Sequence, residues 1–212
     1  LAIDSLETEW KEYPVFHLSF GTGNFTESQT LRQILEDYIS EKEEEYGRNV
    51  NANTLGGRFA SLLHAAHKKT GRRAVVLIDE YDKPLLDVLD TNYKGIQDGQ
   101  EFPLEEVNRN ILKGFYSVFK DADQDLKFVL LTGVTKFSQV SVFSGFNQPD
   151  DISMNRRYEA LCGITKEELL TVFDSSIREL ADDLDISYEE TVERLKKKYD
   201  GYHFGKKMID IF

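Results

Sequence analysis

The chain has 212 residues, 40% of them hydrophobic, which suffices for the core of one full domain with a small appendage. Its formal net charge of −12 argues against direct binding of nucleic acid, and its single cysteine, Cys162, excludes a disulfide framework. Because the sequence has no signal-peptide pattern and no apolar run of about 18 residues, it favours a soluble cytoplasmic protein with no membrane partner.

The N-terminal part predicts a strand, a turn and a helix. Residues 15–20 (VFHLSF) form an apolar run that ends at the glycine-rich turn Gly21-Thr22-Gly23. This turn has no lysine and no third glycine at the dinucleotide-binding spacing, so we interpret it as a strand-to-helix connection. A capping box over 26–29 (TESQ) then predicts the start of an amphipathic helix that ends near Gly47.

A second helix precedes the most informative stretch of the chain. Apolar residues at helical spacing from Leu55 to Ala66 predict a helix that ends at Gly71. Residues 74–78 (AVVLI) then predict a strand buried on both faces, as in a parallel sheet, and Asp79 and Glu80 follow directly.

The position of these two acids indicates chemistry. Ligands of open α/β sheets bind outside the carboxyl ends of the strands. In nucleotide hydrolases this pattern is the Walker B element, in which the first acid holds Mg²⁺ and the second orients or deprotonates the attacking water. Asp79 and Glu80 match those two roles, and the alternative is an ordinary strand followed by an acidic loop.

The next elements complete the expected α/β core. Residues 91–103 are polar with two glycines and predict a mobile loop. A helix over 107–119 and a buried strand over 128–131 follow. The alternation of strands and helices predicts βαβ units, and therefore a parallel sheet with helical layers.

The C-terminal part predicts a small helical subdomain. Capping boxes at 165–168 (TKEE) and 187–190 (SYEE) open helices over about 165–183 and 188–199. We therefore divide the chain into an α/β core, residues 1–163, and a lid-like helical subdomain, residues 164–212.

Polar residues also follow the second buried strand. In P-loop enzymes a neighbouring strand ends in a residue, sensor 1, that contacts the γ-phosphate or the attacking water. Thr132 or Thr135 suits that role, with Lys136 as a cation for the developing negative charge. The alternative is a strand cap and a surface lysine.

Other familiar sites are missing from the sequence. The phosphate loop G-x-x-x-x-G-K-[ST] occurs nowhere in the chain. His64 and His67 lie three residues apart without an accompanying metal-ligand pattern, so we expect them on a helix surface or in the core. Cys162 has no histidine at a recognisable spacing and is interpreted as a small hydrophobic residue.

Six ordered motifs together resemble the predicted AAA-ATPase-like family, a bacterial branch of the P-loop ATPases related to signalling (STAND-like) members. The motifs are VLIDEYDKPL (76–85), LTGVTKFS (131–138), FSGFN (143–147), DIS (151–153), CGIT (162–165) and YDGYHF (199–204). The resemblance runs from about Trp10 across nearly the whole chain.

The resemblance implies a fold and a mechanism. Family members usually carry an Arg-Arg-Phe-Gly-Lys-Ser phosphate loop upstream and a restriction-endonuclease-like nuclease domain downstream. Relative to that pattern the chain, which starts at Leu1 rather than Met, is expected to be an excised P-loop core without its first strand and Walker A loop. In an intact parent, Asp79 would hold Mg²⁺, Glu80 would position water, and Thr132 or Thr135 with Lys136 would sense the γ-phosphate of ATP. The fragment itself is expected to bind no cofactor and to be inactive.

We therefore predict the central and lid part of a P-loop ATPase that acts as a nucleotide-driven switch on a partner protein or on its own downstream domain. One rival is a non-catalytic interaction module in which the acidic pair is degenerate. A second rival is a Mg²⁺-dependent nuclease that uses Asp79, Glu80 and Asp82; the acidic surface and the lack of a following E-x-K strand argue against it.

Loss of the phosphate-loop strand would change the sheet. In ATPases of this resemblance that strand lies beside the sensor strand, so its removal would leave residues 128–131 as an edge that invites pairing. We expect either that residues 158–162 pair with this edge or that two copies of the chain form a homodimer through it. The alternative is a monomer in which a loop or helix covers the gap.

Overall fold

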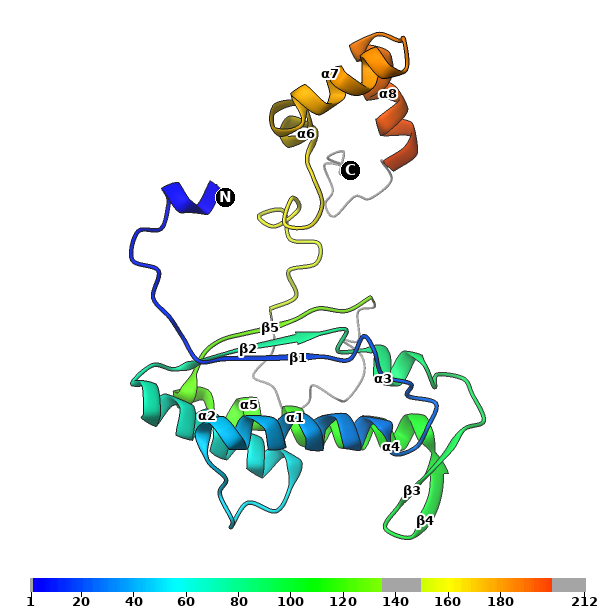
Figure 1. The fold of residues 1–212 in the computed structure, drawn as a ribbon. Helices are drawn as coiled ribbons and strands as arrows, with labels where there is room; N and C mark the ends of the chain where they lie inside the picture. Colours follow the sequence, from blue (N-terminus) through cyan, green and yellow to red (C-terminus); the bar gives the residue numbers. More distant parts are fainter. Residues whose placement is uncertain (1, 135–149, 200–212) are drawn as a thin grey trace. The chain divides into compact units, whose positions relative to one another are not determined.

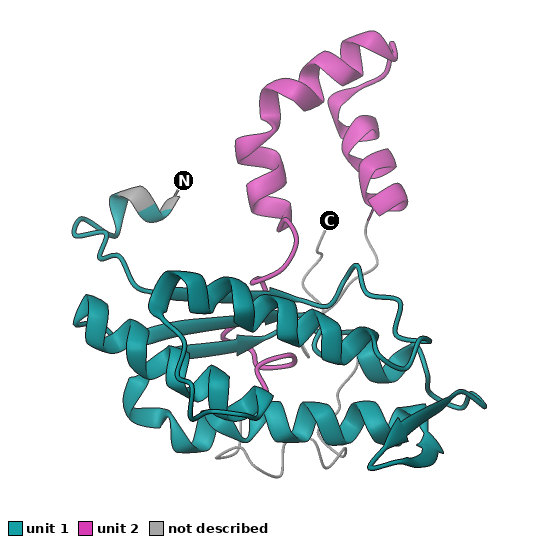
Figure 2. Ribbon diagram, turned by 60° about the horizontal axis from the view of Figure 1, so that its bottom comes forward, with its two compact units in different colours: residues 1–148 teal, residues 149–212 magenta. Residues whose placement is uncertain are grey.

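The computed structural model describes residues 2–134 and 150–199. The chain forms two compact units, residues 1–148 and residues 149–212, which have separate colours in Figure 2. The domain boundary expected between residues 163 and 164 stays a prediction.

The first unit is built on a parallel sheet, as the sequence predicts. Its three strands are β1 (Val15–Ser19), β2 (Ala74–Asp79) and β5 (Leu126–Leu131), in the order β1-β2-β5. Both neighbouring pairs are parallel, so the carboxyl ends of all three strands meet at one edge. Strand β2 lies in the centre, which places the end of the 74–79 strand between the ends of the other two.

Helices of this unit cover one face of the sheet. Figure 1 shows α1, α2, α4 and α5 on the same side of the three strands. The bounds of the helices are α1 (Thr30–Tyr46), α2 (Leu55–Thr70), α3 (Lys83–Leu86), α4 (Leu104–Tyr116) and α5 (Val118–Asp121), with short 3₁₀ helices at Ala2–Ser5 and Asp123–Asp125.

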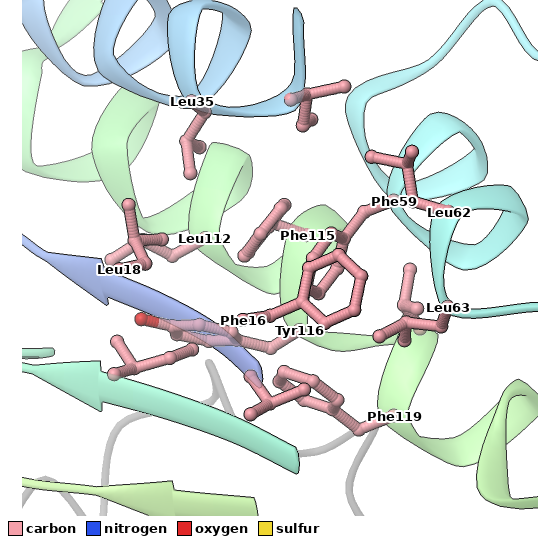
Figure 3. Packing of buried hydrophobic residues seen from close by; sticks show 14 of the residues in the cluster. Phe16, Leu18, Leu35, Phe59, Leu62, Leu63, Leu112, Phe115, Tyr116 and Phe119 are labelled. Atoms are coloured by element: carbon pink, nitrogen blue, oxygen red, sulfur yellow. The ribbon is translucent and has the colours of Figure 1, made fainter. Parts of the chain in front are cut away.

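The core lies between the sheet and these helices (Figure 3). Phe16 and Leu18 of β1 point to the helical side and are buried, whereas Val15 on the other face of the strand is 47% exposed. Phe59 of α2 stacks on Phe115 of α4 with their ring centroids 4.8 Å apart. Burial of such a side chain contributes about 1.5–3 kcal/mol to folding, so this cluster fixes the helices against the sheet.

Two helix boundaries test the sequence patterns. Helix α2 begins where Thr54 accepts a hydrogen bond from the Gly57 amide at 3.0 Å and ends at Gly71 in a left-handed conformation. The capping box expected at residues 26–29 is wrong. The hydroxyl of Thr26 donates to Asn24 Oδ1 instead, and α1 begins only at Thr30 without a side-chain cap.

The mobile loop expected over residues 91–103 is also wrong, because that segment contains a β-hairpin. Strands β3 (Lys94–Gln97) and β4 (Gln100–Pro103) pair in antiparallel register. The two residues between them, Asp98 and Gly99, have φ angles of 52° and 77°. Asp-Gly is the preferred sequence for such a two-residue turn, since both positions require a positive φ.

The second unit is helical in its described part, as expected. Helix α6 (Lys166–Val172) begins with the predicted capping box, in which Thr165 and Glu168 exchange hydrogen bonds. The single helix expected over 165–183 is divided at Phe173, and α7 (Asp174–Asp183) follows. Helix α8 (Tyr188–Tyr199) matches the prediction, with Ser187 accepting from the Glu190 amide at 3.1 Å.

Strand β5 is an edge within the described sheet, since it pairs with β2 alone among the described strands. Phe128 on this strand is 51% exposed. Residues 158–162 belong to the second unit and consist of turns and bends. Their expected pairing with this edge stays a prediction.

The second expectation, that the isolated chain associates through β5, also stays a prediction and can be measured. Light scattering at micromolar concentrations should detect a dimer, and Phe128→Lys should convert it to a monomer, since a lysine at an edge blocks strand pairing. Val50→Lys, at an exposed loop position, is the matched control and should leave the dimer intact. A wild-type chain that stays monomeric would contradict this prediction.

None of the described helices is both long and apolar enough to cross a lipid bilayer.

Candidate functional site

The register of the strands places three polar residues next to one another at the carboxyl edge of the sheet. Ser19, the last residue of β1, pairs in register with Asp79, the last residue of β2. Ile78 pairs with Leu131, the last residue of β5, so Thr132 comes next to Asp79 on the other side. Side chains of residues that pair in register on adjacent strands point to the same face of the sheet, so these three side chains form one row.

Asp79 makes a direct contact with Thr132, the residue that follows β5. The Thr132 hydroxyl donates a hydrogen bond to Asp79 Oδ1 at 2.5 Å. Two backbone hydrogen bonds hold the strand ends together, from the Thr132 amide to the Ile78 carbonyl and from the Tyr81 amide to the Thr132 carbonyl, each at 2.9 Å. The structure thus joins a predicted metal ligand to a predicted sensor residue.

Glu80 adopts an unusual backbone conformation. Its φ angle is +53°, in the left-handed region that residues other than glycine, asparagine and aspartate rarely occupy. Such strain costs on the order of 1–3 kcal/mol and clusters at functional sites. The Glu80 carboxylate lies beside the turn after β1, where a Cβ on Gly21 would be 3.4 Å from Glu80 Oε1. The strained turn therefore directs Glu80 away from the side of Asp79 that Thr132 occupies.

Asp82 is the third acid of this edge and has a different environment. It is 1% exposed and lies against Gly133, the residue after Thr132. The sequence interpretation used Asp82 only in the nuclease alternative and missed this contact. The glycine directly after the sensor strand was the one signal for it, since a glycine at such a place often marks a close approach.

Thr135 and Lys136, the other two predicted catalytic residues, lie outside the described residues. Their assignments stay predictions. The cation nearest in sequence to the acidic cluster within the described part, Lys83, forms an ion pair with Asp87 at 2.8 Å.

The donor chemistry of the edge fits magnesium. Asp79, Thr132 and Ser19 offer only hard oxygen atoms, which Mg²⁺ prefers, and Mg²⁺ is usually held by one or two carboxylates with the phosphates of a substrate. In the part of the chain that the structure describes, no group of three or more His, Cys, Asp or Glu side chains is arranged to hold a metal by itself.

His64 and His67 lie away from this edge, on α2. Their Nδ1 atoms face the carboxylate of Asp125, at 3.3 Å for His64 and 2.7 Å for His67. Asp125 is buried just before β5, so these contacts join the end of α2 to the start of that strand. A pocket of about 190 Å³ lies elsewhere again, between the start of α1, the β3–β4 hairpin and α4, and none of the predicted site residues lines it.

The sequence was compared with protein families, with curated proteins and with solved structures. Residues 1–143 match the family described as predicted AAA-ATPase. The chain is 39% identical over 168 residues to a protein of Azotobacter chroococcum mcd 1 described as an uncharacterized protein in the vnfD 5′ region. That match covers 78% of this chain and 30% of the relative, so the chain spans about a third of the relative's length. No solved structure matches the chain significantly. With two thirds of its residues matched, the chain belongs to the predicted AAA-ATPase-like family.

Proposed function

We propose that this chain carries the Walker B acids and a sensor residue of a P-loop ATPase, and that it acts within a longer protein, which we call the parent protein. The observation that supports the proposal most is the hydrogen bond from Thr132 on β5 to Asp79 at the end of the central strand β2. In P-loop ATPases an acid after one strand holds Mg²⁺, and a polar residue after the neighbouring strand contacts the γ-phosphate or the attacking water; Asp79 and Thr132 suit these two roles.

Each described residue has a separate role in this proposal. Asp79 would hold Mg²⁺ through its carboxylate, and the Thr132 hydroxyl would orient that carboxylate. Glu80 would orient or deprotonate the attacking water. A bound Mg²⁺ ion would supply charge neutralisation for the transferred phosphoryl group. We keep Thr135 and Lys136 as further candidates for contacts to the γ-phosphate.

We propose further that nucleotide hydrolysis works as a switch on a partner protein or on a downstream domain of the parent protein. The helical second unit suits a lid that responds to the nucleotide. The net charge of −12 disfavours nucleic acid as the direct partner of this segment.

Phosphate release from ATP by the parent protein tests the proposal. The wild-type protein should release phosphate in the presence of Mg²⁺, and Asp79→Ala should weaken binding of the magnesium–nucleotide complex. A matched control, Asp98→Ala in the β3–β4 turn, changes a carboxylate outside the site and should leave binding unchanged. A parent protein that binds no nucleotide would contradict the proposal.

The 212-residue chain alone should bind Mg²⁺·ATP only weakly. Most nucleotide affinity of P-loop proteins comes from the backbone amides and lysine of the phosphate loop, a motif that this sequence does not contain. Asp79 and Glu80 without that loop repel a polyphosphate. Calorimetry should therefore show a Kd no lower than about 1 mM, equivalent to roughly −4 kcal/mol. Micromolar affinity would show that another segment of the chain binds the phosphates.

A further inference from the structure

Gly133 lies closer to Asp82 than a residue with a Cβ atom at position 133 would permit. A Cβ atom added to Gly133 would lie 2.6 Å from Asp82 Oδ1 and 2.8 Å from Asp82 Cγ, well inside normal contact. It would also lie 2.7 Å from Cε1 of Tyr81. Gly133 has no side chain, and so the segment after β5 packs directly on the Asp82 carboxylate.

Hydrogen bonds from helix α3 hold the backbone of Asp82 in place. The amides of Leu85 and Leu86 donate to its backbone carbonyl at 2.9 Å and 3.0 Å. On α4, the buried Asn108 Nδ2 donates to the carbonyl of Pro84 at 2.8 Å, which ties helix α3 to α4.

Tyr116 of α4 lies beside Asp82 as well. Burial raises the pKa of the Tyr116 hydroxyl, and the neighbouring Tyr81 and Asp82 raise it further. The tyrosine therefore stays neutral beside the carboxylate. Asp82 is 1% exposed, so its carboxylate lies inside the fold between the segment after β5 and these helices.

The contact lies at the point where the two catalytic strands leave the sheet. Asp82 follows Asp79 and Glu80 on the β2 side, and Gly133 follows Thr132 on the β5 side. The backbone hydrogen bond from Tyr81 to Thr132 lies between them. A shift of Gly133 away from Asp82 would therefore move Thr132 relative to Asp79.

We propose that Asp82 and Gly133 are positioning residues that lock the end of β5 to the end of β2 and so hold the Thr132 hydroxyl on the Asp79 carboxylate. The catalytic consequence rests on the proposed ATPase function. Catalytic constellations lose activity when a group moves by about 0.5–1 Å, so a contact that fixes these strand ends sets the rate without touching the nucleotide.

Amide hydrogen exchange on the 212-residue chain tests the lock directly. Gly133→Ala should speed exchange of the Tyr81 and Thr132 amides by about tenfold or more. Gly114→Ala is the matched control: nothing lies within 4 Å of a Cβ at that position on α4, and exchange at the site should not change.

Second-site changes separate size from charge at position 82. In the Gly133→Ala background, Asp82→Ala removes the Oδ1 and Cγ atoms that the new methyl group meets, leaves its contact with Tyr81 Cε1 in place, and should restore slow exchange in part. Asp82→Asn keeps the same size and should not restore it. If Gly133→Ala alone does not fold, recovery of folding by Asp82→Ala but not by Asp82→Asn supports the lock.

Unchanged exchange in Gly133→Ala, or equal effects of the two changes at position 82, would overturn the proposal.

The same variants in the parent protein test the catalytic consequence. Gly133→Ala should lower kcat at least tenfold while the Kd for Mg²⁺·ATP stays within about twofold, and Asp82→Ala in that background should raise kcat again. A loss of nucleotide affinity equal to the loss of kcat would overturn the positioning role. A wild-type parent protein without ATPase activity would instead overturn the proposed function, while the exchange measurement would still decide whether the lock exists.

Discussion

Replacing Glu80 by glutamine in the parent protein should lower the rate of ATP hydrolysis by about 10²–10⁴-fold, the usual contribution of a general base. The amide keeps the shape of the side chain but does not accept a proton from water. Nucleotide affinity should stay within about twofold, because Asp79 and not Glu80 is the proposed metal ligand. Phosphate release together with equilibrium nucleotide binding measures the two effects separately.

A matched control is available for this variant. Glu101→Gln removes an exposed carboxylate on β4, outside the site, and should leave both quantities unchanged. If Glu80→Gln hydrolyses ATP at the wild-type rate, Glu80 is not the residue that activates water. Its strained backbone would then need another explanation.

Replacing Arg58 by methionine should destabilise the first unit by about 3–5 kcal/mol, the usual cost when one partner of a buried ion pair is removed. Arg58 on α2 is 8% exposed and donates from Nε and Nη2 to the two oxygens of Glu43 on α1, both at 2.8 Å. It also donates to Ser40 at 3.1 Å and forms an ion pair with Glu36. The variant leaves the Glu43 carboxylate buried without its fork-shaped partner.

Urea unfolding measures this loss, and two further variants check its cause. Arg48→Met removes an arginine that is 65% exposed and 3.8 Å from Glu43, so the change in unfolding free energy should be below about 1 kcal/mol. Adding Glu43→Leu to Arg58→Met should recover most of the lost stability, because a buried pair replaced by apolar residues is often neutral. An Arg58→Met variant as stable as wild type would show that the network contributes nothing.

The same pair predicts a pH dependence. The hydrogen bond from Arg58 holds the pKa of the Glu43 carboxyl below its ordinary value of 4.5. A carboxyl group whose pKa is lowered by folding stabilises the protein above its unfolded pKa, and that stability is lost as the pH falls through the folded pKa. Wild-type stability should therefore decrease on acidification below about pH 4.5, and more steeply than that of Arg58→Met. Equal slopes for the two proteins would contradict the assigned cause.

The elements predicted well from the sequence are those that depend on local pattern. The apolar run over 74–78 predicts a strand of a parallel sheet, and β2 is such a strand, although Val75 and Leu77 on its second face are only partly buried. The rule that ligands bind at the carboxyl ends of strands drew attention to the acids after it. Thr132 was a candidate for the same reason. Its contact with Asp79 follows once β5 lies beside β2 in parallel register.

The features that were missed depend on a second residue far along the chain, or on a turn that was not recognised. The polar composition of residues 91–103 predicts a loop, although Asp98-Gly99 is a hairpin turn sequence, because the residues that flank it do not alternate clearly between apolar and polar. The contact between Asp82 and Gly133, like the ion pair between Arg58 and Glu43, joins residues whose distance in space no sequence period encodes. The positive φ angle of Glu80 could not be predicted from the sequence either, because a glutamate does not indicate a left-handed backbone.

Metal coordination by Asp79 is the most direct test of the proposed site. Electron paramagnetic resonance of Mn²⁺ in the presence of ATP reports how tightly the parent protein holds the metal–nucleotide complex, with Mn²⁺ standing in for Mg²⁺. Wild type should bind the complex, and Asp79→Asn, which has nearly the same shape but no charge, should bind it at least tenfold more weakly, while Glu80→Gln should bind it as wild type does. Equal affinity of wild type and Asp79→Asn would contradict the assignment of Asp79, and with it the Walker B interpretation of this chain.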